Sequence, residues 1–208
     1  MATQNAKTGP GERTQALKAV PFFTQMNDQE LDVIRSLSVE KSFPKNAVVL
    51  TEGEIGDSLY IVEHGRVKVF IGDEDGREII LKILGPGHFF GEMSMIDSQP
   101  RSASVTTLEP STLLVLTHAS FETCVERAPR IANMVLRILA QRVREADRKI
   151  GTLALMDVYG RVASTLLELA VPKNGQLVVS EKLSQQDIAN MVGASREMVS
   201  RILKDLSD

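Results

Sequence analysis

The stretch 185–206, QQDIANMVGASREMVSRILKDL, constrains the fold most, because its apolar residues are spaced like two short helices joined by a tight turn. In the first helix Ile188 and Val192 lie one turn apart, and Ala189 is small enough for a second helix to approach closely. Gly193 supplies the turn. In the second helix the positions expected to face inward are apolar: Met198, Val199, Ile202, Leu203 and Leu206. The sequence therefore predicts a helix-turn-helix.

The second helix carries a polar outward face. Ser195 is its expected cap, and the residues predicted to point outward are Arg196, Glu197, Ser200 and Arg201. Arginine can donate two hydrogen bonds to guanine, and glutamate can accept one from cytosine, in the major groove of DNA. The pattern predicts readout of G·C pairs in double-stranded DNA. The alternative is an ordinary helical hairpin with a solvated charged face.

Net charge does not by itself favour a nucleic acid. The formal net charge of the chain is −3, and residues 151–208 hold six basic and seven acidic side chains. DNA binding would therefore depend on where the charges are placed, and we expect it to be strongly salt-sensitive.

Length and composition restrict the class of protein. A chain of 208 residues suits two domains, and 43% hydrophobic residues can fill two cores. The one cysteine, Cys124, excludes an intramolecular disulfide and any four-cysteine iron-sulfur or zinc site. The first residues are polar, and no apolar run is long enough to span a bilayer, so we expect a cytoplasmic protein with no membrane partner.

Residues 15–128 are predicted to form a β-rich domain that begins with two short helices, the second capped by Asp28. Between about residues 40 and 118 the chain consists of short β-rich runs separated by Gly, Asp and Pro. These runs are VVLTEG, SLYIVEHG, RVKVFIG, EIILKILG, RSASVTTL and STLLVLT. Many short strands at this spacing indicate an antiparallel barrel or jelly roll, and with the helices elsewhere they predict an α+β fold.

A long helix is predicted over residues 129–156, after a short helical turn at 120–125. Its apolar residues follow the 3, 4 spacing of a coiled-coil seam: Leu136, Leu139, Val143, Ala146, Ile150 and Leu153. We interpret this seam as the interface of a parallel homodimer, which could address a DNA palindrome. Alternatively, the seam packs on its own barrel, although a second apolar edge at Ile131, Val135 and Ile138 could serve that purpose.

Residues 157–208 are predicted to form the DNA-binding domain, after a candidate hinge at 152–158. A compact helix, DVYGRVASTLLELA, is followed by a turn, VPKNGQ, and a short β segment, LVVSEK, which lead to the helix-turn-helix.

The segment GPGHFFGEMSMIDSQPRSASV holds the candidate ligand site. Gly91 allows a close backbone approach, and the residues from Glu92 can form one helical turn with free N–H groups. Arg101 is expected on the apolar face of its strand, where a guanidinium must find an anion. That anion could be Glu92, in a structural ion pair. It could instead be a phosphate held by Arg101 and Ser102, which leaves Glu92 free to accept from a sugar hydroxyl.

Taken together, these motifs resemble the cyclic AMP receptor protein family (Crp/Fnr) of bacterial transcription regulators. The resemblance extends from about residue 15 to residue 208 and includes FGEM, RSA, the long helix, LMDVYGR and GASRE in that order. It implies a jelly-roll cyclic-nucleotide-binding domain, a dimerisation helix and a C-terminal winged helix-turn-helix. The given sequence stops at Asp208, just after the recognition helix, so we expect no wing within it; either the sequence is cut short there or the protein lacks the wing.

The resemblance also implies the site residues. Gly91, Glu92 and Met93 would lie on the ribose side of a cyclic nucleotide, and Arg101 and Ser102 would hold its phosphate. The adenine-contacting Thr-Ser pair of the family aligns with Ala146 and Asp147. Ala146 cannot hydrogen-bond a base, so the expected effector, cyclic AMP, would bind more weakly, or another nucleotide such as cyclic GMP or cyclic di-GMP would replace it.

On the DNA side, the resemblance implies that bases of a TGTGA-like half-site are read by Arg196, Glu197 and Arg201. The helix-turn-helix residues Ser184 and Gln186 would contact phosphates. Family members act as homodimers with RNA polymerase as a further partner.

No set of nucleophile, base and orienting residue is visible, so we expect a regulator and not an enzyme, with no metal or cofactor beyond the effector. The histidines His64, His88 and His118 are scattered over turns and strand ends. The alternative function is a cyclic-nucleotide-binding regulatory module that acts by protein contact.

Overall fold

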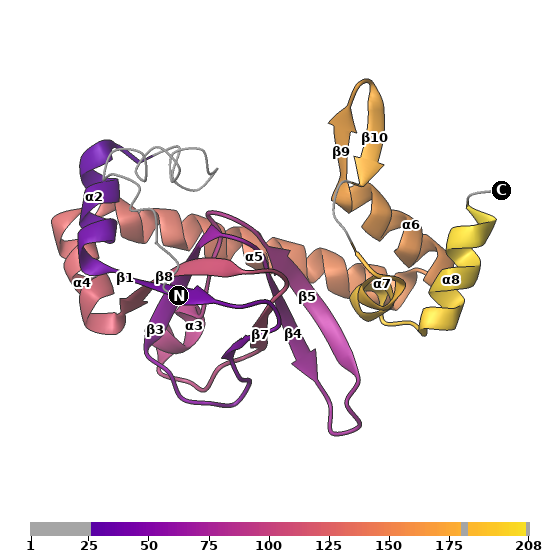
Figure 1. Ribbon diagram of the computed structural model, residues 1–208, viewed down its shortest axis with the longest axis horizontal. Helices are drawn as coiled ribbons and strands as arrows, with labels where there is room; N and C mark the ends of the chain where they lie inside the picture. Colours follow the sequence, from indigo (N-terminus) through magenta and orange to yellow (C-terminus); the bar gives the residue numbers. More distant parts are fainter. Residues whose placement is uncertain (1–25, 180–182, 207–208) are drawn as a thin grey trace, which may run out of the picture. The chain divides into compact units, whose positions relative to one another are not determined.

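The computed structural model describes residues 26–179 and 183–206, which form two compact units (Figure 1). The first unit contains the chain up to Val69 together with Ile83–Arg137. The second contains Phe70–Lys82 and the chain from Ile138 onward. The first of the two short helices expected before residue 40 falls outside the described residues.

Helix α2 (Asp28–Leu37) opens the described chain. Asn27, and not Asp28, is its N-cap: the Asn27 side chain accepts from the Glu30 backbone, and the Glu30 carboxylate accepts from the Asn27 backbone. The predicted cap was therefore wrong by one residue. Leu31 and Ile34 are buried on the inner face of the helix.

Two four-stranded antiparallel sheets form the β domain, as the sequence predicted. The first has the order β1-β8-β3-β6, with bounds Val39–Phe43, Ser111–Thr117, Ser58–His64 and Phe89–Phe90. The second has the order β2-β7-β4-β5, with bounds Val48–Leu50, Ser104–Thr107, Val67–Gly72 and Glu78–Leu84. Strands β1 and β6 correspond to no run recognised in the sequence. β1 is largely exposed and so lacks an apolar face, and β6 has two residues.

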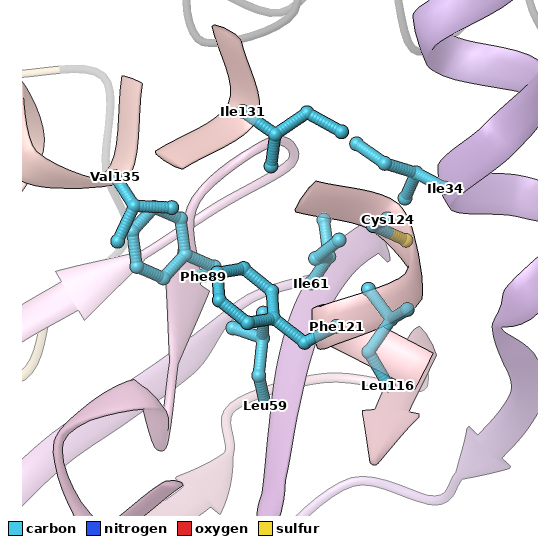
Figure 2. A pocket seen from close by; sticks show the side chains of 9 residues that line it. All are labelled: Ile34, Leu59, Ile61, Phe89, Leu116, Phe121, Cys124, Ile131 and Val135. Atoms are coloured by element: carbon cyan, nitrogen blue, oxygen red, sulfur yellow. The ribbon is translucent and has the colours of Figure 1, made fainter. Parts of the chain in front are cut away.

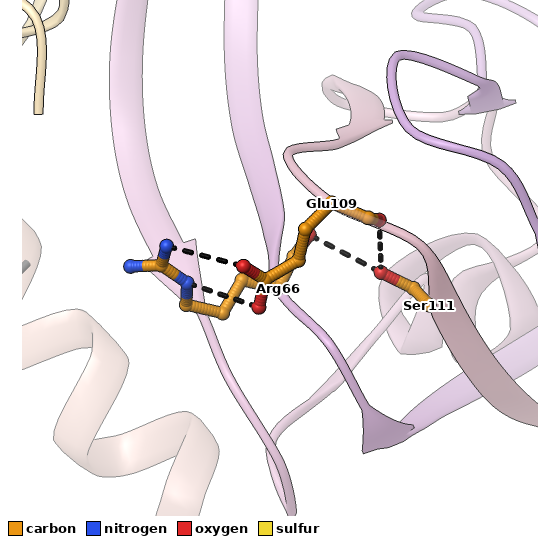
Figure 3. Close-up of polar contacts among 3 residues, drawn as sticks. All are labelled: Arg66, Glu109 and Ser111. Atoms are coloured by element: carbon orange, nitrogen blue, oxygen red, sulfur yellow. Dashed lines mark hydrogen bonds and ion pairs between the residues drawn. The ribbon is translucent and has the colours of Figure 1, made fainter. Parts of the chain in front are cut away.

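The core of the barrel consists of aliphatic and aromatic side chains from both sheets: Leu50, Val62, Val67, Leu84, Phe90, Val105 and Leu113. The connection from β7 to β8 is fastened to the start of β4 (Figure 3). There Glu109 pairs with Arg66 at 3.3 Å, and the Ser111 hydroxyl donates to the backbone oxygens of Glu109 and Arg66. A Cβ at Gly65 would lie 2.3 Å from the Ser111 Oγ, so this turn requires glycine.

Helices α4 (His118–Arg127) and α5 (Arg130–Leu155) follow the barrel. α4 is longer than the helical turn predicted at 120–125, because Thr117 caps it at its N-terminus. A small apolar cavity lies between these helices, α2 and the first sheet (Figure 2). Its lining is Ile34, Leu59, Ile61, Phe89, Leu116, Phe121, Cys124, Ile131 and Val135.

Helix α5 matches the predicted long helix to within one residue at each end. Its second apolar edge is buried in the first unit through Ile131 and Val135. The predicted seam remains uncovered in the single chain, since Leu136, Val143 and Ile150 are each more than 60% exposed.

The remainder of the second unit consists of α6 (Val158–Leu169), β9 (Ala170–Lys173), β10 (Gln176–Val179), α7 (Gln185–Val192) and α8 (Arg196–Asp205). Strands β9 and β10 pair as a hairpin, where we expected a turn followed by a single strand. Its two-residue loop is Asn174-Gly175, both at positive φ, as a tight hairpin turn requires. The small core beneath α6, α7 and α8 contains Val162, Ile188, Ala189, Val192, Val199 and Ile202.

Candidate functional site

Arg101 lies in the segment that leads to β7, and not on the strand itself, which begins at Ser104. The expectation that Arg101 belongs to the apolar face of a strand was therefore wrong. Its backbone N–H donates to the Glu54 carbonyl at 2.8 Å, and its carbonyl accepts from Gly53 at 2.9 Å. This pairing turns the side chain inward, where the residue is only 6% exposed.

The Arg101 guanidinium is enclosed by neutral oxygen atoms. Nη1 donates to the Gly91 carbonyl at 2.5 Å and to the Ser94 hydroxyl at 2.6 Å, and Nη2 donates to the Ser58 carbonyl at 2.9 Å. Burial holds the pKa of Arg101 below its usual value, while the nearby Tyr60, Asp57 and Glu92 oppose that shift. Hydrogen bonds to neutral groups stabilise a buried cation less than an anion would, so this site favours an anionic ligand.

Two elements bring the acceptors to Arg101. β6 pairs with β3 so that Phe90 lies opposite Tyr60, and their rings stack at 5.3 Å, which sets Gly91 beside the Ser58 carbonyl. Gly91 is the left-handed N-cap of α3 (Glu92–Asp97), the helical turn expected there. A Cβ at Gly91 would lie 2.9 Å from Nη1, so both its conformation and the close guanidinium require glycine.

The other predicted ligand residues are Glu92 and Met93, the first two residues of α3, and Ser102. Glu92 is only 2% exposed, whereas Met93 is exposed. The Ser102 hydroxyl donates to the Met93 sulfur at 3.6 Å and is exposed, so it is accessible to a ligand. The structure thus brings Gly91 and Arg101 together, and Met93 and Ser102 together.

Three residues of this site were not identified in the sequence: Gly56, Ser58 and Ser94. Ser58 and Ser94 accept from the guanidinium, and a Cβ at Gly56 would lie 2.5 Å from Nη2. The available signal was the Gly-Asp-Ser sequence directly before a strand, which marks a turn but does not reveal what approaches it.

The predicted base-contacting residues, Ala146 and Asp147, are exposed on α5. Their neighbours hold the β4–β5 hairpin within the second unit. Glu145 pairs with the Lys82 ammonium at 2.5 Å, and the Lys149 ammonium donates to the Ile80 carbonyl at 2.7 Å. Burial lowers the pKa of Lys149.

The helix-turn-helix has the expected geometry. Gly193 caps α7 in the left-handed conformation, and Ser195 caps α8 by accepting from the Met198 backbone at 3.2 Å. Of the predicted DNA-facing residues, Arg196, Glu197 and Arg201 are exposed, while Ser200 is half-buried. Met198 and Leu206 were wrongly expected to face inward, since they are 39% and 44% exposed.

The two predicted phosphate contacts on α7 are engaged within their own helix. The Ser184 hydroxyl forms a capping box with Asp187, and the Gln186 amide donates to Asn190 at 2.7 Å. Both residues remain exposed.

In the part of the chain that the structure describes, no group of three or more His, Cys, Asp or Glu side chains is arranged to hold a metal ion. Over the same ranges, no helix has the length and apolar character needed to cross a membrane.

Two regions of the chain match known domain families. Residues 40–128 match the family model of the cyclic nucleotide-binding domain, and residues 160–208 match that of the Crp-like helix-turn-helix domain. The chain is 40% identical over 169 residues to the CRP-like cAMP-activated global transcriptional regulator of Mycobacterium tuberculosis, a match covering 79% of this chain and 75% of that protein.

Two further relatives cover more of the chain. The cyclic AMP receptor protein of Thermus thermophilus is 34% identical over 192 residues, covering 92% of this chain and 88% of that protein. Among solved structures, the c-di-GMP responsive global regulator CLP of Xanthomonas campestris matches with a TM-score of 0.76 at 28% identity, covering 87% of this chain and 92% of that chain.

Proposed function

The chain belongs to the cyclic AMP receptor protein (Crp/Fnr) family of cyclic-nucleotide-controlled transcription regulators, and from this premise we propose its specific action. It is a homodimer that binds a palindromic, TGTGA-like DNA site when cyclic AMP occupies the β domain. It acts as a regulator and not as an enzyme, as the name of the relative at 40% identity suggests.

The observation that carries the proposal is the buried Arg101 guanidinium among neutral oxygens. A cyclic phosphate has one negative charge, and it can pair directly with this cation, whose hydrogen bonds in the structure go to neutral oxygens. Arg101 and Ser102 hold the phosphate, Glu92 accepts from the ribose hydroxyl, and Gly91 and Met93 border the sugar. Ala146 and Asp147, on α5, contact the base.

Cyclic AMP is favoured over other effectors by the names of the relatives. The relative at 40% identity is described as cAMP-activated, while the structural neighbour described as responsive to c-di-GMP is 28% identical. Asp147 can accept a hydrogen bond from an exocyclic amine, which both adenine and guanine carry. Cyclic GMP and cyclic di-GMP are therefore the competitors to be measured.

Dimerisation is supported by the exposed seam of α5. Three long aliphatic side chains, Leu136, Val143 and Ile150, lie seven residues apart and are each more than 60% exposed. Covering such a stripe with the same stripe of a second copy buries it along its whole length. The two-fold axis that results gives the pair of recognition helices the symmetry of a palindrome.

On DNA, the exposed side chains of Arg196, Glu197 and Arg201 read the bases of each half-site from α8. Ser184 and Gln186, at the start of α7, hold the phosphate backbone. Ser195 and Ser200 are the further residues of α8 and its cap that contact DNA. RNA polymerase is the further partner through which a bound dimer alters transcription.

Isothermal titration calorimetry with cyclic AMP, cyclic GMP and cyclic di-GMP tests the effector. We expect cyclic AMP to bind the wild-type protein most tightly and Arg101→Ala to lose at least tenfold in affinity, because the phosphate loses a charged donor. Arg77→Ala is the matched control, since Arg77 is an exposed arginine paired with Asp73 at the hairpin tip. Equal affinity in wild type and Arg101→Ala would refute the proposed site.

Fluorescence anisotropy with a palindromic TGTGA duplex and a scrambled duplex, at moderate salt, tests DNA recognition. We expect tighter binding to the palindrome, and tighter still with the effector present. Equal affinity for the two duplexes would favour the alternative of a nucleotide-binding module that acts by protein contact.

A further inference from the structure

Arg161 connects three parts of the second unit. It lies in the first turn of α6, and its guanidinium reaches in two directions. Nη1 donates to the Met156 carbonyl at 3.2 Å, at the end of α5, and Nη2 donates to the Gly193 carbonyl at 3.5 Å, in the turn between α7 and α8. One side chain thus touches both the end of the long helix and the turn that precedes the recognition helix.

Both acceptors stand at the C-terminal ends of helices. Met156 follows the last residue of α5 and donates back to the Thr152 carbonyl, and Gly193 is the C-cap of α7. The last carbonyls of a helix lack partners within it and carry the negative end of the helix dipole. A guanidinium placed between two such ends is attracted to both, and it holds them at a fixed separation.

The orientation of the Arg161 guanidinium is fixed at the cost of one hydrogen bond. Its Nε is buried and has no hydrogen-bond partner among the described residues. An unsatisfied buried donor is unfavourable. The guanidinium therefore makes its two hydrogen bonds to carbonyls while its Nε forgoes one. This arrangement is what we expect of a side chain that fixes a distance between other elements.

A second contact lies at the same joint. The Leu153 side chain comes within 3.8 Å of the position that a Cβ at Gly193 would occupy. Leu153 is the last residue of the predicted dimer seam and is still 39% exposed. The last residue of the seam, the end of α5 and the turn of the helix-turn-helix therefore lie close together.

We propose that Arg161 is a positioning residue that clasps the turn before the recognition helix to the end of the dimer helix, so that dimer geometry sets helix orientation. The inference rests on the proposed function, because it assumes that the orientation of α8 matters for DNA binding. A flexible linker at residues 152–158 would not transmit orientation, whereas a clasp between two helix ends does.

Intrachain distance measurement tests the clasp without DNA or effector. Spin labels are placed on α5 and α8 through Arg144→Cys and Asp205→Cys in a Cys124→Ala background, and labelled chains are diluted with unlabelled chains. Pulsed electron paramagnetic resonance then gives the distance distribution. We expect a narrow distribution for wild-type Arg161 and a broad one for Arg161→Met, which keeps the apolar stem but removes the charge.

Two further variants separate positioning from stability. Arg161→Lys should restore part of the narrow distribution, because one ammonium can reach one of the two carbonyls. Arg148→Met is the control, since Arg148 is exposed and donates to the Arg144 carbonyl of its own helix. A lower melting temperature for Arg161→Met with an unchanged distribution would overturn the inference.

The DNA assay then distinguishes this inference from the proposed function. For the wild type we expect cyclic AMP to tighten DNA binding, and for Arg161→Met we expect the ratio of Kd values without and with cyclic AMP to fall about tenfold. If the wild type does not respond to cyclic AMP, the proposed function fails while the distance measurement still decides on the clasp. If Arg161→Met keeps the wild-type ratio, the clasp fails and the proposed function stands.

Discussion

The most direct test of the Arg101 pocket is the substitution Gly56→Ala, which adds one methyl group against the guanidinium. An ideal Cβ at Gly56 would lie 2.5 Å from Nη2, 2.7 Å from Nε and 2.8 Å from Cζ of Arg101. The Gly56 backbone is outside the left-handed region, so alanine adds no backbone strain there. The effect of the substitution is therefore confined to the contact with Arg101.

The magnitude follows from these distances. The contact between two non-bonded heavy atoms is most favourable when they lie about 3.5–4.0 Å apart, so the guanidinium must move away from the new methyl group by about 1 Å. Such a shift disrupts the 2.9 Å bond from Nη2 to the Ser58 carbonyl and the two bonds from Nη1. A guanidinium displaced by this distance also fails to reach the proposed phosphate. A hydrogen bond of a charged group is worth about 1.5–3 kcal/mol, so losing one bond to the phosphate weakens cyclic AMP binding by at least ~10-fold. Overpacking should also lower the free energy of unfolding by about 1–3 kcal/mol.

Calorimetric titration of cyclic AMP and thermal unfolding measure both effects. Gly72→Ala is the matched control: its Cβ would meet the Arg77 carbonyl at 3.6 Å, an ordinary van der Waals contact, and its φ is also unexceptional. The reasoning is refuted if Gly56→Ala binds cyclic AMP as tightly as wild type does. In that case the guanidinium of the bound protein does not occupy the cage seen here.

Three other changes test separate parts of the molecule. Val143→Glu places a charge in the exposed seam of α5 and should convert dimer to monomer in sedimentation velocity, whereas an unchanged sedimentation coefficient would locate the interface elsewhere. Burial raises the pKa of the Cys124 thiol to about 11, so Ellman's reagent at pH 8 should modify it only after denaturation; rapid reaction of the native protein would contradict this burial. Ala146→Thr should tighten cyclic AMP binding by about 1 kcal/mol through one new hydrogen bond, and no change in calorimetric affinity would mean that the base does not face this residue.

The sequence predicted correctly those features of the fold that depend on the local spacing of apolar residues. The 3, 4 spacing along α5 identified the helix to within one residue at each end, and it separated the buried edge at Ile131 and Val135 from the exposed seam. Burial of Arg101 was also predicted, although its supposed strand was wrong. Its Ser58 partner could not be found, because that carbonyl lies 43 residues away in the chain and becomes a neighbour only when the barrel closes.

The β9–β10 hairpin was missed for a different reason. Pro172 interrupts the run AVPK and argues against a strand, because proline cannot donate to a sheet ladder. In a hairpin of two strands every strand has a free edge, so a missing donor is tolerated. The Asn174-Gly175 pair is the specific hairpin signal in this segment.

Charge in the DNA-binding region shows why placement matters more than the total. Asp157 and Asp187 both accept backbone N–H groups at the starts of helices, where the positive end of the helix dipole offsets their charge. Arg196 and Arg201 are exposed on α8. The acidic excess of residues 151–208 is thus partly offset at helix N-termini, while these two cations remain on the surface proposed to meet DNA. A net count treats all of these charges alike and so misjudges the potential of that surface.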